Sequence, residues 1–464
     1  YAQESNPHDS VPWWKNQVVY QIYPRSYQDS NGDGVGDLKG IISRLDHIKS
    51  LGVDVIWIAP FFKTPSFDTG YDITDYQSVD PLFGTMADFE QLVQEIHKRD
   101  MKIMLDMVFS YTSPQHPWFL ESQKSTTNPK ANWYLWRDGR GKAAPNNWIN
   151  ASTFELAWKY FPERQQWAYG GFTKEMPHLN LRNPSVIDEH HKTLKFWLDK
   201  KVDAFRFDLA FQTDWKASDF IETIQENERL YPYPKYQPTY LASNHDYVRS
   251  GTRLKGRMDR AKVLALLQGT LRGTPMIYQG EEIGMVNGTI PDYEAFDFIP
   301  YTLTSVLTKL AALVNLDLPF AANRDNVRTP MQWSGAQHAG FSSTLKKTWV
   351  KINADYAQVN VEKELQEPDS VLTTYQKIFA LRKASKPLQF GSITLLKQMP
   401  QNVVGFERQW NLEKAVVLVN MGDSATRVSV TPYTTQQVKL GLNQAQLVNG
   451  VAELPPQGAL VLGQ

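Results

Sequence analysis

Two aspartates follow short apolar segments, at positions where side chains at the edge of a sheet could perform chemistry. Asp208 ends the run Asp203-Ala204-Phe205-Arg206-Phe207-Asp208, and Asp246 ends Ser243-Asn244-His245-Asp246. Cleavage of a glycosidic bond needs a nucleophile, a general acid and a group that stabilises an oxocarbenium-like transition state. Arg206 favours the ionised form of a neighbouring carboxyl group, which suits a nucleophile and not an acid. Taken alone, an Arg–Asp pattern is more typical of a structural salt bridge, and it is the second aspartate that favours catalysis.

The elements around these aspartates alternate between apolar strands and amphipathic helices. Apolar runs predict strands at residues 18–23, 54–59, 102–108, 203–208, 239–243 and 276–279. Helical spacing and helix-start signals predict helices at 38–51, after Thr85, after Asn183-Pro184, and at 259–271. Continuous apolar strands that alternate with such helices predict a parallel sheet covered on both faces.

The alternation of strands and helices is interrupted by one insertion and ends before the C-terminal part. Residues 110–180 are rich in Asn, Pro, Trp and Gly without a long periodic helix, so we predict an inserted subdomain there. From about residue 388 short alternating segments predict a C-terminal antiparallel β-sandwich. The expected domains are therefore 1–109 and 181–386 for the parallel sheet, 110–180 for the insertion and 387–464 for the C-terminal part.

Several motifs in a fixed order resemble glycoside hydrolase family 13, the α-amylase superfamily, and most closely its oligo-1,6-glucosidase and α-glucosidase branch. The resemblance covers nearly the whole chain. It is carried by the segments at residues 20–26, 70–76, 206–208, 244–246, 278–284 and 328–333, the last reading Arg-Thr-Pro-Met-Gln-Trp. The resemblance implies an α/β fold: a (β/α)8 TIM barrel with a B domain inserted after strand three and a C-terminal β domain.

The resemblance also implies roles for individual residues. Asp208 would be the nucleophile that forms a covalent glucosyl intermediate, with Arg206 keeping it ionised, and Asp246 would stabilise the transition state. The sugar would be bound by Tyr71, Asp72 and His245. Arg328 would pair with Asp72 and close the pocket, so that the enzyme acts on the non-reducing end of short α-glucosides.

Three residues depart from the family's pattern inside matching motifs. Tyr111 stands where the family usually has a histidine that contacts the bound glucose, and it could donate one hydrogen bond although it is bulkier. His178 stands in place of the usual aspartate. Leu209, directly after Asp208, is typical of neither the α-1,4 nor the α-1,6 preference. These changes would either retune the substrate or mark a lineage released from catalysis.

An acidic loop early in the chain predicts a structural metal site. Oxygen ligands occur at every second position, and the spacing matches the first half of an EF-hand loop without its closing Glu. We expect Ca²⁺, or Mg²⁺, with the alternative of a solvated acidic turn. The expected ligands are the side chains of Asp29, Asn31, Asp33 and Asp37 and the carbonyl of Val35.

The interval between the two aspartates is too short for a complete barrel. Asp246 follows Asp208 by 38 positions (246 − 208), and residues 211–238 supply only 28 of them. At about 250 residues for eight units, each unit takes roughly 30, so two units are missing. The family's acid, a Glu that ends strand five, belongs there, and Glu281 and Glu282 do not replace it. We therefore hypothesise that the 464-residue sequence omits residues of the molecule near 230–236, and an intact mass near 53.1 kDa would refute this.

Bulk properties limit the partners. The formal charge is zero with Lys and Arg scattered, so neither nucleic acid nor an anionic membrane is expected as a partner. No run approaches a membrane span of about 18 apolar residues. With zero cysteines there is no thiol chemistry, and a bacterial cytoplasmic or an exported location both remain open. The alternative to an enzyme is a catalytically silent homologue that binds sugar or a partner protein. The family-like heavy chains of amino-acid transporters are of that kind, but they carry an anchor and a linking cysteine not found in this sequence.

Overall fold

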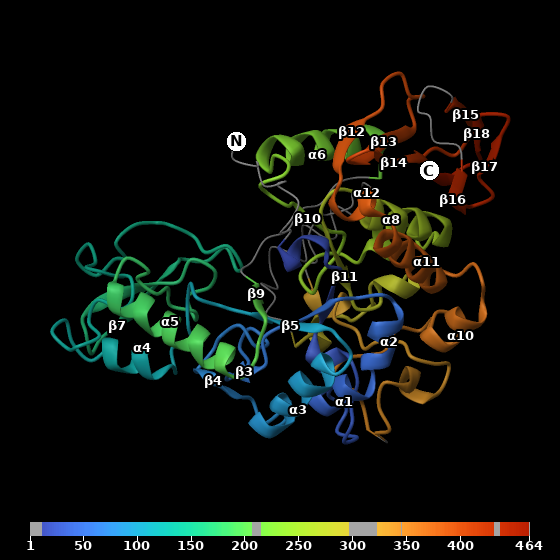
Figure 1. Ribbon diagram of the computed structural model, residues 1–464. Helices are drawn as coiled ribbons and strands as arrows, with labels where there is room; N and C mark the ends of the chain where they lie inside the picture. The colour runs from blue at the N-terminus through green and yellow to red at the C-terminus, as the bar shows by residue number, and fades with distance from the viewer. Residues whose placement is uncertain (1–11, 207–214, 297–322, 345, 431–436, 464) are drawn as a thin grey trace.

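The centre of the molecule is a parallel sheet. The computed structural model describes residues 12–206, 215–296, 323–344, 346–430 and 437–463 (Figure 1). In these residues six strands run in the order β10-β11-β1-β2-β5-β9, and every neighbouring pair is parallel. Their bounds are β1 Val19–Ile22, β2 Val55–Ile58, β5 Lys102–Asp106, β9 Ala204–Arg206, β10 Thr239–Leu241 and β11 Thr274–Tyr278. The predicted parallel sheet is confirmed, and all residues of β1 and β2 are buried because both faces of the sheet are covered.

The sheet is open between β9 and β10 in the part of the chain that the structure describes. Each of these two strands has one neighbour, β5 and β11 respectively. One residue of the three in β9 is buried and none in β10, in contrast to the fully buried β1 and β2. The interval between β9 and β10 contains helix α6 (Ala217–Leu230).

Helices cover the sheet and begin at recognisable capping residues. Thr85 and Asp88 form a reciprocal capping box at the start of α3, and the Asn183 side chain accepts from the Ser185 amide at the start of α5. The α-helices are α1 Leu38–Ser43, α2 Leu45–Ser50, α3 Met86–His97, α4 Pro117–Ser122, α5 Pro184–Asp199, α7 Ser250–Arg253, α8 Met258–Thr270, α10 Val361–Gln366, α11 Val371–Ala384 and α12 Lys386–Phe390. The 3-10 helices are η1 Trp13–Asn16, η2 Pro24–Ser26, η3 Glu281–Ile283, η4 Asp292–Glu294, η5 Arg324–Asn326 and η6 Gln337–Gly340.

The single helix expected over residues 38–51 is wrong in one respect, because Arg44 divides it into α1 and α2. Arg44 has φ −116° and ψ 8°, outside the helical range. Its guanidinium donates to Gln28 at 2.7 Å and lies 4.4 Å from the ring centre of Trp333. These side-chain contacts accompany the local departure from helical geometry, and apolar spacing does not report them.

The segment between β5 and α5 forms its own small unit, beside the sheet at the left of Figure 1. Its strands are β6 Trp136–Arg137, β7 Trp158–Phe161 and β8 Gln166–Tyr169, antiparallel in the order β6-β8-β7. An aromatic core that includes Phe119, Trp133 and Trp136 holds it together. The short antiparallel pair β3 (Phe62–Lys63) and β4 (Asp75–Val79) lies between this unit and the central sheet.

Two antiparallel sheets make up the C-terminal part. The first has five strands in the order β12-β13-β14-β19-β16 and the second has three, in the order β15-β18-β17. Val403, Val416 and Leu418 of the first sheet share one apolar cluster with Val428 and Leu454 of the second. The bounds are β12 Ser392–Leu395, β13 Val403–Trp410, β14 Glu413–Asn420, β15 Thr426–Ser429, β16 Gln437–Leu442, β17 Gln446–Val448, β18 Val451–Leu454 and β19 Ala459–Gly463.

Two buried arginines bind the turn between α8 and β11, one from helix α11 and one from the C-terminal sheets. Arg382 of α11 donates to the carbonyls of Gly269 and Gly273 at 3.0 and 2.8 Å. Arg408 of β13 donates to the carbonyl of Thr270 at 2.5 Å and to that of Gly391 at 2.9 Å. The turn between α8 and β11 is therefore bound by guanidinium groups from two later elements.

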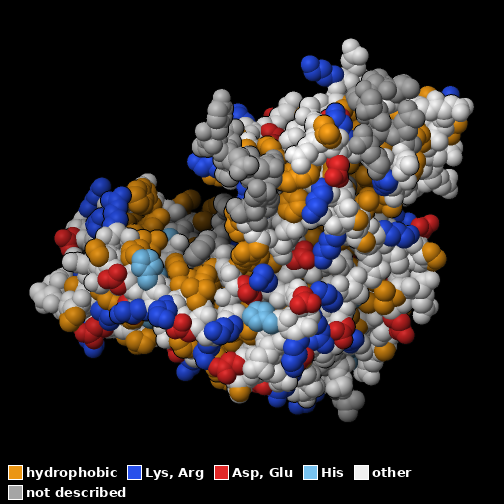
Figure 2. Space-filling model, in the orientation of Figure 1, with side chains coloured by type: hydrophobic (Ala, Val, Ile, Leu, Met, Phe, Trp, Pro, Cys, Tyr) orange, Lys and Arg blue, Asp and Glu red, His pale blue; other side chains and the backbone are white. Residues whose placement is uncertain are grey.

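The surface carries both signs of charge. Figure 2 shows Lys and Arg interspersed with Asp and Glu over the face in view. Among the described helices none is long and apolar enough to cross a membrane.

Candidate active site

His245 lies at the centre of a buried hydrogen-bond chain at the carboxyl ends of the parallel strands. Gln21 of β1 lies 2.7 Å from its Nδ1, and the Tyr71 hydroxyl lies 2.6 Å from its Nε2. Tyr71 donates its single hydroxyl proton to Asp106 at 3.1 Å, so Nε2 carries a proton and donates to Tyr71. Nδ1 then accepts from the Gln21 amide. Each link in the chain has a defined donor and acceptor.

The surroundings keep His245 neutral. Burial lowers its pKa from 6.5 to about 3, although Asp246 opposes this shift. Tyr71 and Tyr23 stack on its imidazole with ring centres 5.4 and 5.7 Å away and planes within 6° and 16°. The ring is therefore a fixed, neutral hydrogen-bond donor.

Asp106, at the end of β5, binds Arg206 at the end of β9. Nη1 of Arg206 lies 3.0 and 2.9 Å from the two carboxylate oxygens, and both side chains are buried. Trp57 also donates to Asp106, at 3.2 Å. Arg206 was expected to hold Asp208, but Asp208 and the following Leu209 lie outside the described residues, so that contact stays a prediction.

Asp246 is held by two arginines. Its Oδ1 lies 2.8 Å from Nη2 of Arg328 and 3.2 Å from Nη1 of Arg324. Burial raises the pKa of this carboxyl group, but His245 and the charges of Arg328 and Arg324 outweigh it, and the net pKa is well below the usual range. Asp246 is thus an anion at ordinary pH values. An anion can stabilise positive charge, whereas a general acid has to carry a proton.

The expected pairing of Arg328 with Asp72 is wrong. Arg328 is fully buried and donates to the His245 carbonyl at 2.8 Å, to Thr69 at 2.9 Å and to Asp246. Asp72 instead accepts from Thr64 and from the backbone amides of residues 67 and 68, which fixes its own loop. Burial raises the pKa of Asp72, partly offset by these hydrogen bonds. Its side chain therefore closes a turn rather than the pocket.

The carboxylate of this loop that pairs with an arginine is Asp68, and its partner is Arg324. The sequence did not predict this pair. The Asp68 carboxylate lies 2.5 Å from Nη2 of Arg324, whose other nitrogen reaches Asp246. The signal was present, because Asp68 precedes Gly70-Tyr71 in the same motif and Arg324 stands four positions before Arg328. Choosing between neighbouring acids and neighbouring arginines required the geometry of two loops more than 250 residues apart (324 − 68).

Tyr111 and His178, two of the unusual residues, contact each other. They form an isolated antiparallel bridge, and their ring centres are 5.5 Å apart. Tyr111 also stacks with Phe172 at 6.1 Å, and burial lowers the pKa of His178 to about 4. The two departures are therefore structurally paired inside the inserted unit.

The loop at residues 29–37 is held by its own backbone. Asp29 accepts from the amides of Asn31, Gly32 and Gly34 at 3.0, 2.7 and 2.8 Å. Asn31 and Asp33 each accept from the amide two residues later, and Asp37 caps α1. No group of at least three His, Cys, Asp or Glu side chains able to hold a metal is present in the described part of the chain. The oxygen donors still suit a hard cation chemically.

The two glutamates after β11 belong to separate networks. Glu281 accepts from Ser243 at 2.5 Å and from Gln268 at 2.9 Å, and Glu282 accepts from Tyr20 at 2.7 Å. Burial raises the pKa of Glu281 against the effect of these hydrogen bonds. The carboxylates described around His245 are those of Asp68, Asp106 and Asp246, and all three are aspartates.

Carboxylates, arginines and a neutral histidine at the carboxyl ends of parallel strands define the class: an α/β enzyme of the barrel type. The chain belongs to the alpha-amylase family, because the model of the alpha amylase catalytic domain matches residues 21–231 and 210–391. Its named relatives are glycoside hydrolases.

Three named proteins show how far the similarity extends. It is 32% identical to the oligo-1,6-glucosidase of Parageobacillus thermoglucosidasius over 514 residues, which covers 89% of this chain and 91% of that protein. It is 33% identical to the trehalose-6-phosphate hydrolase of Escherichia coli K12, covering 88% and 91%. Among solved structures, the isomaltulose synthase of Protaminobacter rubrum is similar with a TM-score of 0.89 at 30% identity, covering 98% of this chain and 100% of that one.

Proposed function

We propose that the protein is a retaining α-glucosidase or closely related transglucosylase that acts on short α-glucosides from the non-reducing end. The observation that carries this proposal is the Asp68–Arg324–Asp246–Arg328 cluster beside neutral His245. The linked loops would close one end of a sugar pocket, which favours attack at a chain end. Similarity to oligo-1,6-glucosidases and to an isomaltulose synthase supports glucosidase or glucosyl-transfer chemistry.

In the proposed reaction the role of Asp208, which lies outside the described residues, follows from the family resemblance, and the roles of the described residues follow from their contacts. Asp208 would attack the anomeric carbon and form a glucosyl ester, as retention requires. Anionic Asp246 would stabilise the positive charge that develops on the sugar, and His245, whose Nε2 proton is donated to Tyr71, would hold the Tyr71 ring in place. The ion pair of Arg206 with Asp106 would hold the floor of the site.

We propose that two barrel units, with the Glu that serves as general acid, are missing from the 211–238 interval, near residues 230–236. The family model supports this, because its two matches, 21–231 and 210–391, meet inside that interval. The alignment with the Parageobacillus protein supports it too: 89% of 464 residues is about 413, so about 101 of 514 positions (514 − 413) have no residue here. The proposal predicts an intact mass larger than 53.1 kDa by the mass of roughly 60 residues. A measured mass near 53.1 kDa would refute the proposal that two barrel units are missing.

A substrate panel tests the activity itself. The panel contains maltose, isomaltose, sucrose and trehalose, and each is incubated with wild type and with Asp208→Asn. Release or transfer of glucose by the wild type, lost in Asp208→Asn, is expected. Failure of a protein of the larger mass to turn over any sugar would overturn the enzyme proposal.

An α-glucosyl fluoride assay separates a missing acid from a silent homologue. Fluoride leaves without protonation, so a 53.1 kDa chain that lacks the acid but keeps Asp208 should release fluoride and retain one glucosyl unit, visible by mass. The same chain should not cleave maltose. If it releases no fluoride above the Asp208→Asn level, the alternative of a sugar- or protein-binding homologue without catalysis is favoured.

We also propose that the loop at residues 29–37 binds Ca²⁺, or Mg²⁺, in a structural role. Asp29, Asn31, Asp33 and Asp37 and the Val35 carbonyl would supply the oxygen ligands. When bound, the cation would tie the loop after β1 to the start of α1, and it would take no part in the reaction.

A further inference from the structure

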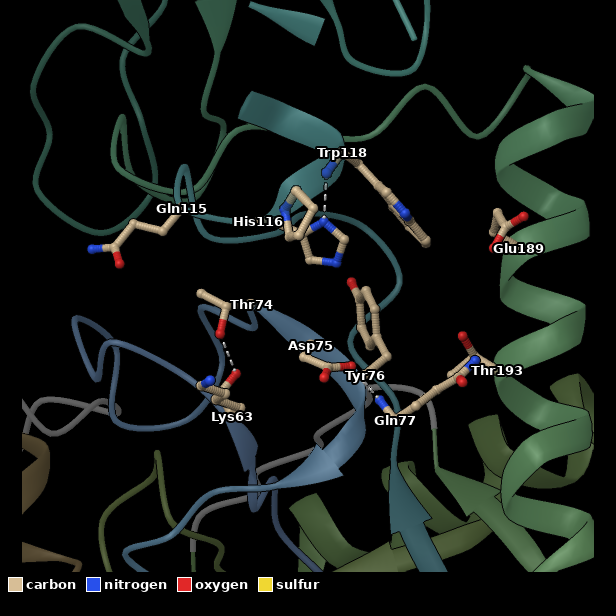
Figure 3. A pocket seen from close by; sticks show the side chains of 11 residues that line it. Lys63, Thr74, Asp75, Tyr76, Gln77, Gln115, His116, Trp118, Glu189 and Thr193 are labelled. Carbon is tan, nitrogen blue, oxygen red and sulfur yellow. Dashed lines mark hydrogen bonds between the residues drawn. The ribbon is translucent and has the colours of Figure 1, made fainter. Parts of the chain in front are cut away.

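A cavity separate from the candidate active site lies between the β3–β4 pair, the start of α4 and helix α5. Its volume is about 610 Å³, within the usual range of small-molecule sites. Three elements form its walls: β4 with Tyr76 and Gln77, the start of α4 with His116 and Trp118, and α5 with Glu189 (Figure 3). None of the residues around His245 and Asp246 described above lines it.

The aromatic wall of the cavity is rigid. Tyr76 is buried and donates to the carbonyl of Val108 at 2.8 Å, which fixes its ring. The His116 and Trp118 ring centres are 4.5 Å apart, and Trp118 in turn meets Trp133 at 5.1 Å. Rings held in this way offer apolar surface at a small entropic cost.

His116 adds a buried donor to this wall. Only 4% of the residue is exposed, and burial lowers its pKa to about 3, so the ring is neutral. Nδ1 accepts from the Trp118 amide at 3.1 Å, and the proton of the neutral ring therefore lies on Nε2. Figure 3 shows the His116 ring beside Trp118 and Tyr76 in the wall of the cavity.

The remaining lining groups mix donors and acceptors. Asp75 accepts from the Gln77 amide through Oδ1, and Glu189 pairs with Lys192 through Oε1, so both contribute carboxylate acceptors to the lining. Lys63 contributes an ammonium group, and amides come from Gln77 and Gln115. Neither sign of charge dominates, which disfavours a strongly charged ligand. Aromatic faces with scattered donors and acceptors match a molecule that has apolar ring faces and many hydroxyls.

We propose that this cavity is a second, non-catalytic binding site for a short neutral carbohydrate. It is connected to the candidate active site along the chain, because Tyr76 of β4 follows Tyr71 by five residues (76 − 71). The proposal does not depend on catalysis, since the lining residues are distinct from the proposed catalytic ones.

Calorimetric titration of the whole chain with maltotriose or isomaltotriose tests the proposal. The titration is made in an Asp246→Asn background, which weakens binding at the candidate active site. One saccharide bound per chain in this background is expected. Gln77→Ala with Glu189→Ala should weaken that binding at least tenfold. Asp188→Ala, an exposed neighbour on α5 that does not line the cavity, should leave it unchanged.

A second variant keeps the test independent of folding. Gln77 is exposed, so Gln77→Trp should fill the cavity mouth and abolish the binding while near-ultraviolet circular dichroism stays native. Binding that survives Gln77→Trp, or that is absent in the Asp246→Asn background, overturns the proposal. Neither outcome touches the proposed glucosidase activity, which the substrate panel measures on its own.

Discussion

Replacing Arg328 by lysine should separate the geometric role of this arginine from its charge. Three donations from the buried guanidinium reach the His245 carbonyl, Thr69 and Asp246, at 2.8 to 2.9 Å. A lysine ammonium is a single point and cannot reproduce a planar fork that points in three directions. The most favourable outcome is that lysine keeps the ion pair with Asp246 and leaves the other two acceptors without a donor.

The size of the effect follows from those two acceptors. A buried polar group left without its partner costs about 1–3 kcal/mol. Loss of the donors to the His245 carbonyl and to Thr69 should therefore lower the free energy of unfolding by about 2–6 kcal/mol. Arg427→Lys is the matched control, because the Arg427 side chain is 77% exposed in its pair with Glu453 and little change is expected.

Urea denaturation of both variants, with the midpoint and slope compared with wild type, measures this difference. A loss of less than about 1 kcal/mol in Arg328→Lys, with an unchanged slope, would show that the fork geometry contributes little, contrary to the reasoning. A loss as large in Arg427→Lys would show that the effect is not specific to the buried site.

Three further predictions concern stability. Burial lowers the pKa of His190 from 6.5 to about 4, so the unfolded chain takes up this proton first as the pH falls, and stability is lost between pH 6.5 and 4. His190→Phe should remove up to about 1.4 kcal/mol per pH unit from that slope in pH-dependent urea unfolding, and the same slope in His190→Phe and in the exposed control His191→Phe would contradict this. Asn183→Ala should cost about 1 kcal/mol, because the side chain that caps α5 is lost, and Asn183→Ser should restore most of it; equal melting of all three proteins would argue against the cap. If the 29–37 loop binds calcium, free Ca²⁺ at 100 times its Kd should stabilise the protein by about 2.7 kcal/mol relative to protein in chelator, and the gain should vanish in Asp33→Ala; an unchanged melting temperature would exclude a tight site.

The sequence predicted the elements well where a local signal determines them. Apolar runs located β1, β2 and β5 to within two residues, and the starts of α3 and α5 fell at their capping residues. These features depend on side chains within a few positions of one another. The division of the helix at Arg44 was missed because it accompanies contacts with Gln28 and Trp333, far away in the chain.

The sequence predicted which residues belong to the site, but it did not predict which acid binds which arginine. Tyr71, Arg206, His245, Asp246 and Arg328 all lie in or beside one hydrogen-bonded cluster. Which acid meets which arginine depends on how two loops approach, and a shift of four residues along either loop changes the partner. Asp68 and Arg324 therefore had to come from the structure.

The guanidinium groups of Arg382 and Arg408 have a consequence for engineering the chain. Both are buried, and both bond carbonyls of the turn at residues 269–273, which leads into β11 at the centre of the sheet. Truncation before residue 382 would remove both cations and leave those carbonyls without donors. Arg382 lies in α11, before the C-terminal sheets, and Arg408 lies in β13, so removal of the sheets alone still removes the donor to the Thr270 carbonyl. A graft of these sheets from a relative would need an arginine in the register of Arg408.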